Sequence, residues 1–508
     1  MTADPGAERK EAPWWARTAR EQAAAVREGR VTAAEVVESH LERIAEVNPV
    51  VNAVTQLLAD QAREAAAGLD RRRERGEDLP PLAGVCFTVK ESIAVRGVPT
   101  THGATHFKDA VAAADAPPVA RLRAAGAIPV GHSNMPTLTL AGMHSRSQLF
   151  GDTVNPWDPG RTPGGSSGGD GAAVACGMAG LGLGNDAGGS VRIPAAFCGT
   201  AALKPTYGRF PADHRMGPED PPLGAQLCVV DGPLARTVAD LWPAFEALAG
   251  ADPVDPRAVP VPPRGAPVAR PVRVAVVADP GGLGVHPTVR RAVERAADAL
   301  ADAGHVVEEV ADVPRLGEAL EVYDSLLMTE FSLSWPAVRT LLGTEGRRYI
   351  EMHMPKTRTV DLPGYIRLTG VLLSLRRAWA EFLDRYPLVL GPVFTEPPVE
   401  PGVESRDEAG NARVRSAMRL CSATSLVGVP AVAVPTGLAD GLPTGVQLIG
   451  RAYREDLCLD AAAAVEERLG VLTPVTPATP TAPATPTAPA TPTAPATPTA
   501  PGGTPGRT

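Results

Sequence analysis

The sequence predicts an α/β fold built around a mixed and largely covered β-sheet. Short apolar runs of strand length alternate with segments of helical periodicity along most of the 508 residues. The composition, 44% apolar and 21% charged, is that of a globular protein. The apolar runs stay shorter than the roughly 18 residues that a membrane span needs, so no membrane segment is expected.

The N-terminal part is predicted to begin with helices. Thr32 and Glu35 form a capping box, and the apolar residues that follow, from Val36 to Val47, have helical spacing. A second helix is expected over 56–73. The stretch 82–89 then alternates large and small apolar residues and is expected to form a strand.

The remaining elements follow the same alternation. Gly126 is a plausible end for the helix predicted just before it, and the Ala/Gly-rich segment after 168 is expected to be a closely packed helix. The predicted helices are 118–125, 168–180, 287–303 and 455–469. The predicted strands are 127–131, 181–184, 272–277, 388–390, 431–434 and 446–449.

Both ends of the chain differ from the rest. Residues 1–14 are expected to be a flexible N-terminus and 15–472 a single domain. From 473 to 508 the chain is rich in Pro, Ala and Thr, and the unit ATPTAP repeats from residue 478. Proline at every third position removes backbone donors, so this tail is predicted to be disordered.

Charge and cysteine usage exclude several classes of protein. The net charge of −8 argues against a nucleic-acid partner. The six cysteines have neither zinc-site nor CxxC spacing and do not suggest a disulfide framework, which fits a reducing compartment. The N-terminus lacks the apolar core of a secretory signal, and we expect a cytoplasmic protein.

Lys90 is the first candidate for chemistry, because it directly follows the predicted strand 82–89. A lysine at the end of a buried strand can lose its hydration, which lowers its pKa. The neutral amine could then serve as a base. The alternative is an ordinary surface lysine.

Two serines lie in glycine-rich loops. Ser166 belongs to the segment GGSSGG at 164–169, and Ser190 follows Gly188 and Gly189. Glycines let a substrate and backbone N–H groups approach a hydroxyl closely. The N–H groups before a helix start at 191–194 could form an oxyanion hole. The alternatives are a turn serine and a helix cap.

A Ser-His-Asp triad is the competing arrangement. Residues 164–168 match the letters of G-x-S-x-G, but the preceding segment is loop-like, whereas a nucleophile elbow follows a strand. His132 and His144 lie nearest to the glycine loops in the sequence and stay open as candidates.

Taken together, these segments resemble the amidase signature family. The resemblance rests on Lys90, on GGSSGG at 164–169 and on DAGGSVRIPA at 186–195. Further similar segments are NPWD at 155–158, LKPTYG at 203–208, GPLART at 232–237 and the block 428–448. The resemblance covers residues 15–470 and implies a large mixed central sheet with helices on both faces.

The resemblance also implies a Ser-Ser-Lys triad and the hydrolysis of a carboxylic amide without metal or cofactor. Ser190 would be the acyl-forming nucleophile, and Ser166, expected after a cis peptide bond, would relay its proton to Lys90. The oxyanion hole would consist of the backbone N–H groups of Ala187, Gly188, Gly189 and Ser190. One such donor is typically worth about 3 kcal/mol.

Small departures from the family pattern leave these groups in place. Asn185 and Ala187 stand where threonine and a larger residue are common, and Asp170 stands where a small residue is frequent. Asp186 and Arg192 are expected to brace the loop rather than to take part in the chemistry.

The leading hypothesis is a free-standing amidase that acts on a small amide and not on peptide bonds, without nucleic acid or membrane; a homodimer is an assembly to consider. The alternatives are the glutaminase subunit of a tRNA-dependent amidotransferase and a catalytically silent scaffold. The stretches 137–147, 211–228 and 316–368 are expected to line the pocket. Their apolar residues suggest an aryl or alkyl acyl group: Leu140, Met143, Leu326, Leu327, Met328 and Phe331.

Overall fold

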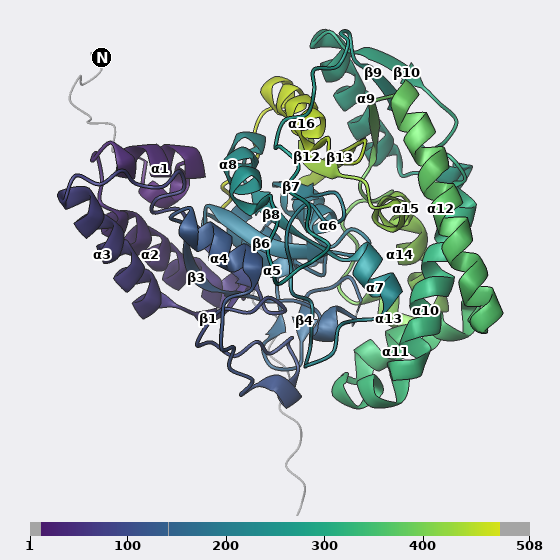
Figure 1. The fold of residues 1–508 in the computed structure, drawn as a ribbon, viewed down its shortest axis with the longest axis horizontal. Helices are drawn as coiled ribbons and strands as arrows, with labels where there is room; N and C mark the ends of the chain where they lie inside the picture. The colour runs from purple at the N-terminus through teal and green to yellow at the C-terminus, as the bar shows by residue number, and fades with distance from the viewer. Residues whose placement is uncertain (1–11, 141, 478–508) are drawn as a thin grey trace, which may run out of the picture. The chain divides into compact units, whose positions relative to one another are not determined.

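The computed structural model describes residues 12–140 and 142–477. Within them, eleven strands form one mixed sheet in the order β1-β3-β2-β6-β8-β7-β12-β13-β11-β9-β10 (Figure 1). The strands of this sheet are β1 (Val54–Leu57), β2 (Cys86–Lys90), β3 (Ile128–Ser133), β6 (Leu181–Asp186), β7 (Ala201–Lys204), β8 (Val230–Ala235), β9 (Arg273–Val276), β10 (Val306–Glu309), β11 (Leu388–Pro392), β12 (Ala431–Ala439) and β13 (Leu442–Gly450). The pair β4 (Arg146–Ser147) and β5 (Gly151–Asp152) stands apart.

Helices surround this sheet. They are α1 (Ala19–Arg27), α2 (Ala33–Val51), α3 (Ala59–Glu74), α4 (Pro117–Ala124), α5 (Gly168–Ala175), α6 (Arg192–Cys198), α7 (Leu223–Cys228), α8 (Val238–Leu248), α9 (Pro287–Asp302), α10 (Leu316–Leu341), α11 (Thr344–His353), α12 (Leu362–Arg385), α13 (Val403–Arg406), α14 (Glu408–Ala417), α15 (Arg419–Val427) and α16 (Glu455–Leu469). Short 3-10 turns span Trp14–Ala16, Thr105–Phe107, Thr137–Thr139, Pro280–Gly282 and Met354–Lys356.

The alternation of side chains along each strand builds a core on both faces of the sheet. In β11, Leu388 and Leu390 pack with α9 and α16, whereas Val389 packs with α10, α12 and α15. In β2, Phe87 belongs to the first of these layers and Cys86 packs beneath α2 and α5. The sheet is therefore covered on both faces, as predicted.

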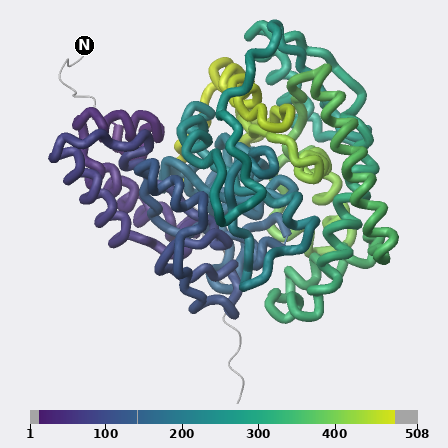
Figure 2. The backbone as a smooth tube through the Cα atoms, in the orientation of Figure 1, coloured from purple at the N-terminus to yellow at the C-terminus, as the bar shows by residue number. Residues whose placement is uncertain are grey.

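The two ends of the sheet carry different helices. The helices α1–α3 pack near β2 and β3, and α10 and α12 pack near β9 and β11. Figure 2 follows the chain from the first group, in purple, to the second, in green. Among the described residues, no helix combines the length and the apolar character that crossing a bilayer requires.

Most predicted elements are present, with two instructive differences. The capping box at Thr32 begins α2, since Thr32 Oγ1 accepts the N–H of Glu35 at 3.0 Å. The helix expected over 56–73 begins only at Ala59, because Val54–Leu57 pairs with β3 as a strand. The helix expected over 168–180 ends at Ala175, and Gly177 has a φ of 76°.

The predicted tail can be followed only in part. Residues 473–477 were assigned to the tail, yet Val475 donates its N–H to the carbonyl of Ala175 at 2.8 Å and packs beside α2 and α5. The remainder of the tail, 478–508, lies outside the described residues, and so do residues 1–11 of the predicted flexible N-terminus.

Candidate active site

Lys90 is the last residue of β2, a strand that lies between β3 and β6. Its side chain is fully buried, and Nζ lies 2.6 Å from Ser166 Oγ and 2.6 Å from Asn185 Oδ1. Asn185 is in turn fixed by donating Nδ2 to Ser92 Oγ at 2.9 Å. The structure thus brings together the predicted lysine and the predicted relay serine.

The environment of Lys90 favours a neutral amine. Burial lowers the pKa of Lys90 to about 7, and the carboxylates of Asp170, Asp186 and Asp231 oppose this shift. An amine with such a pKa is deprotonated in a large fraction of molecules near neutral pH. It can therefore accept a proton from a hydroxyl in contact with it.

Asp170 contributes an unusual buried charge next to this lysine. It lies in the first turn of α5, and Thr88 Oγ1 donates to its Oδ1 at 2.7 Å. Burial raises the pKa of Asp170, and the positive charge of Lys90 acts in the opposite direction. Gly182 leaves room for this side chain, since a Cβ there would lie 2.9 Å from the Asp170 Cβ.

Ser166 lies in a loop that other backbone segments hold closely. The Gly165–Ser166 peptide bond is cis, as the resemblance implies. A Cβ at Gly165 would lie 2.6 Å from the carbonyl oxygen of Met143, so this position has no room for a side chain. Ser145 Oγ donates to the Gly164 carbonyl at 3.0 Å and accepts the Gly168 N–H at 3.1 Å.

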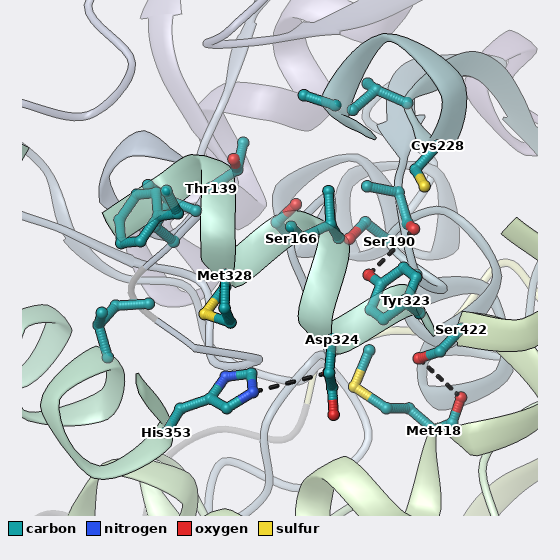
Figure 3. Close-up of a pocket in the computed structure, with 18 of the residues that line it drawn as sticks. Thr139, Ser166, Ser190, Cys228, Tyr323, Asp324, Met328, His353, Met418 and Ser422 are labelled. Carbon is teal, nitrogen blue, oxygen red and sulfur yellow. Dashed lines mark hydrogen bonds and ion pairs between the residues drawn. The ribbon is translucent and has the colours of Figure 1, made fainter. Parts of the chain in front are cut away.

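Ser190 lies in the loop between β6 and α6. The N–H of Ser167 donates to the carbonyl of Ser190 at 3.0 Å, which ties the two serine loops together. Gly189 has a φ of 125°, a conformation that favours glycine. Ser166 and Ser190 line the same cavity (Figure 3).

Tyr323 of α10 supports this loop from the opposite side of the cavity. Its Oη donates to the carbonyl of Ala187 at 3.1 Å, and burial raises its pKa well above the usual value. A Cβ at Gly188 would lie only 2.6 Å from that hydroxyl. The sequence did not reveal Tyr323, because nothing in it links residue 323 to the loop.

Asp186 and Arg192 brace the same loop, as predicted. Both side chains are fully buried, and Arg192 Nε and Nη2 donate to the two oxygens of Asp186 at 3.0 and 2.9 Å. Burial alone would raise the pKa of Asp186, but Arg192 holds it well below its usual range. Asp186 also accepts the N–H groups of Gly189 at 2.7 Å and Val191 at 3.2 Å.

This brace bears on the expected oxyanion hole, because the N–H of Gly189 is already engaged by Asp186. Within the described part of the chain, the N–H groups of Ala187, Gly188 and Ser190 have no protein acceptor. Three of the four expected donors therefore remain available to a ligand.

The histidines do not form the competing triad. Among the described residues, no imidazole is hydrogen-bonded to Ser166 or Ser190. His132 is buried in β3, and neither of its ring nitrogens has a partner there. His144 Nδ1 lies 3.0 Å from Thr162 Oγ1.

The cavity in front of Ser190 has a volume of about 650 Å³ and mostly apolar walls. The three stretches predicted to line it all do so. Leu326 is an exception among the residues named in advance, since it lies in the core with an exposure of 2%. Arg415 of α14, Met418 between α14 and α15, and Ser422 of α15 form a further wall that the sequence did not indicate.

Comparisons with known proteins agree with this geometry. The sequence profile described as Amidase matches residues 35–459. An indoleacetamide hydrolase of Bradyrhizobium diazoefficiens is 40% identical over 466 residues, which are 91% of this chain and 88% of that protein. A glutamyl-tRNA(Gln) amidotransferase subunit of Moorella thermoacetica is 35% identical over 481 residues, with coverages of 89% and 96%.

Solved structures are similar over the same length. A bacterial aryl acylamidase of the amidase signature family superposes with a TM-score of 0.77 at 27% identity, over 90% of this chain and 97% of that one. The 6-aminohexanoate cyclic dimer hydrolase, solved with its substrate, has a TM-score of 0.76 at 28% identity, with coverages of 90% and 98%.

Proposed function

Because this chain belongs to the amidase family and is an amide-hydrolysing enzyme, we propose that it cleaves its substrate through an acyl-enzyme on Ser190. The contact of 2.6 Å between Lys90 Nζ and Ser166 Oγ, beside Ser190 in one cavity, is the observation that carries the proposal. It joins the relay hydroxyl to its base, which is the second step of a proton path from Ser190 that uses an amine in place of an imidazole.

In the first half of the reaction, Ser190 Oγ attacks the amide carbonyl carbon and gives its proton to Ser166. The proton of Ser166 moves at the same time to the neutral amine of Lys90. The negative oxygen of the tetrahedral intermediate accepts hydrogen bonds from the N–H groups of Ala187, Gly188 and Ser190, while the Gly189 N–H stays with Asp186.

In the second half, the C–N bond breaks and its electron pair stays on nitrogen. The nitrogen takes a proton from Ser166, which Lys90 replenishes, and leaves as ammonia or amine. Water then attacks the Ser190 ester and gives a proton through Ser166 to Lys90. The ester C–O bond breaks, Ser190 Oγ takes that proton back through Ser166, and the acid leaves. The enzyme returns to its starting protonation state, as catalysis requires.

The walls of the cavity support an amide with an aryl or alkyl acyl group. It is lined by Leu140, Met143, Leu327 and Phe331. An apolar acyl group would bind there because the removal of apolar surface from water is favourable. The relative named as an indoleacetamide hydrolase suggests arylacetamides, and the similar structure named as an aryl acylamidase also points to an aryl group. We propose arylacetamides as the substrate class.

A second candidate is the glutaminase subunit of an amidotransferase, which the resemblance to the Moorella protein supports. Glutamine carries an ammonium and a carboxylate group, and both need charged or polar partners when they are buried. Charged side chains do line the cavity, but they already have partners: Arg415 pairs with Asp324, and Tyr365 and Gly224 donate to Glu330. This is why we favour the free enzyme; a homodimer and a cytoplasmic location stay predictions.

The test is ammonia release from phenylacetamide, indole-3-acetamide, hexanamide and L-glutamine, together with fluorophosphonate labelling. Labelling should be lost in Ser190→Ala and retained in Ser422→Ala, because Ser422 lines the same cavity from α15. Ammonia from L-glutamine alone would favour the glutaminase. A folded protein in which the probe leaves Ser190 unmodified would favour a silent scaffold.

The activity should also depend on pH through Lys90. Since its pKa is about 7, Lys90 holds its proton at acidic pH and cannot accept another from Ser166. We therefore expect kcat/KM to rise with pH through an apparent pKa near 7 and then to level off. Steady-state rates on an uncharged amide from pH 5 to 9 measure this.

The buried carboxylate of Asp170 provides a second test of whether Lys90 controls the pH dependence. Its negative charge raises the pKa of Lys90. The variant Asp170→Asn should therefore lower the apparent pKa of the kcat/KM profile by up to about one unit. Asp240→Asn is the matched control, because Asp240 is also buried but acts on Arg20 and Arg236 instead. An apparent pKa that is unchanged in Asp170→Asn, or that shifts equally in the control, would contradict this assignment.

A further inference from the structure

The wall of the cavity formed by α10, α11 and α14 carries a group of charged residues among apolar ones. Asp324 of α10 forms an ion pair through Oδ2 with Arg415 Nη2 of α14. Its other oxygen, Oδ1, lies 3.6 Å from His353 Nε2 of α11. Figure 3 shows Asp324 and His353 pointing toward one another on the side of the cavity away from Ser166.

The two oxygens of Asp324 have different surroundings. Arg415 balances the charge of the carboxylate at Oδ2. At 3.6 Å the contact of Oδ1 with His353 is too long for a hydrogen bond. Among the described residues we find no donor to Oδ1, and the side chain keeps 27% of its surface exposed. Oδ1 is thus an acceptor that the protein leaves open to the cavity.

The neighbours of this oxygen make the open acceptor significant. Leu327, Met328 and Ile350 line the same part of the cavity and cannot donate a hydrogen bond. A ligand that fills the cavity would take water away from Oδ1, and a buried polar atom without a partner is costly. A ligand that brings its own N–H or O–H group avoids this cost.

The position of Asp324 sets where that donor must lie. Tyr323, the preceding residue, reaches with its hydroxyl to the Ala187 carbonyl in the Ser190 loop. The backbone of α10 is therefore separated from the loop by the length of one tyrosine side chain. An aromatic acyl group beside Tyr323 would place its distal edge, opposite the amide, near Asp324 (Figure 3).

From this geometry we propose that Asp324 selects arylacetamides whose ring carries an N–H or O–H donor at the edge opposite the amide. The inference rests on the proposed function and specifies its substrate class. Because Arg415 already balances its charge, the carboxylate suits a neutral donor rather than a cation. Asp324 is thus a specificity residue that takes no part in proton transfer.

The experiment compares indole-3-acetamide with benzofuran-3-acetamide, which has nearly the same shape but an oxygen in place of the ring N–H. The wild type should prefer the indole by about ten- to a hundredfold in kcat/KM, the range for a hydrogen bond to a charged group. The double variant Asp324→Leu/Arg415→Met removes the ion pair as a unit, so no lone charge is left behind. In it the preference should fall to about one, while the benzofuran amide is still cleaved.

Glu330→Gln is the matched control. Glu330 is another carboxylate on α10 that lines the cavity, but Tyr365 Oη and the Gly224 N–H already donate to its Oε1 at 2.6 and 2.7 Å. Because Oε1 is occupied, and Oε2 faces Gly224 and Leu326 in a side chain that is only 8% exposed, the preference for the indole should persist in this variant.

Several outcomes would overturn the inference. Equal kcat/KM for the two amides in the wild type, or a preference that survives in the double variant, would do so while leaving the proposed function intact. L-glutamine turnover that the double variant loses would mean that Asp324 and Arg415 bind a zwitterion instead. If neither aryl amide is cleaved, the proposed substrate class fails, and equal dissociation constants for both amides in Ser190→Ala, measured by calorimetry, would separately reject the role of Asp324.

Discussion

Replacing Lys90 with methionine is expected to lower kcat/KM about a thousandfold while the protein stays folded. The amine is the final proton acceptor in the proposed path, and a positioned base contributes about two to four orders of magnitude to the rate. Methionine has a similar length and removes a charged group that is costly to bury. Steady-state kinetics and a thermal melt of the purified variant measure the two effects.

Lys204→Met is the matched control for this variant. Lys204 is equally buried, and burial also lowers its pKa to about 7, but its Nζ donates to the carbonyls of Pro205 and Val429. We expect this variant to be less stable and yet to turn over normally below its melting temperature. If folded Lys90→Met kept the wild-type rate, Lys90 would not be the base.

The second large effect concerns stability. Arg192→Met should lower the free energy of unfolding by about 3–5 kcal/mol, because it leaves the carboxylate of Asp186 buried without its counter-ion. It also removes the hydrogen bonds that Arg192 donates to Gln447 and Ser425. The shift of the denaturant midpoint measures this loss, and fluorophosphonate labelling of Ser190 reports whether the loop is still in place.

A double-mutant cycle tests whether the unpaired charge of Asp186 causes this loss of stability. Combining Arg192→Met with Asp186→Asn should cost less than the sum of the two single changes, since the unpaired charge is then absent. Strict additivity, or an Arg192→Met variant as stable as the wild type, would show that the pair does not brace the loop. Arg215→Met, whose partner Asp213 lies at the surface, should change stability by less than about 1 kcal/mol.

The residues of the site could be predicted to different extents. Lys90, Ser166 and Ser190 belong to short motifs, and a motif is a property of neighbouring residues. Asn185 stood at the end of a predicted strand, and its contact with Lys90 depends on β6 pairing with β2. Tyr323 and Asp324 lie more than 130 residues beyond the loop, in the stretch 316–368 that was expected to line the pocket. Only the packing of α10 against α12 and α15 shows which of its residues face the cavity.

The elements of the fold also divide into those that local sequence predicts and those that depend on pairing with distant strands. The strand β9, a clear apolar run, agrees with the prediction of 272–277 to within one residue at each end, whereas the prediction of 446–449 covers only the second part of β13. The second half of β1 falls within the helix predicted over 56–73, because Val54–Leu57 contains one apolar alternation and its pairing with β3 decides its conformation. The strand β8 contains Gly232 and Pro233, which argue against a strand when the sequence is considered alone.

The chemistry and the recognition of the substrate are encoded in separate parts of this chain. Lys90, Ser166 and Ser190 come from one continuous segment, 90–190, held by β2, β6 and α5, whereas α10, α11 and α14 supply walls from much further along. Apart from Tyr323, which holds the Ser190 loop, residues of the second group can therefore vary without contacting the groups that transfer the proton. Exchanging the segment 316–353 between relatives is consequently a direct route to enzymes with altered amide preferences, and the same modularity would let such preferences diverge rapidly in evolution.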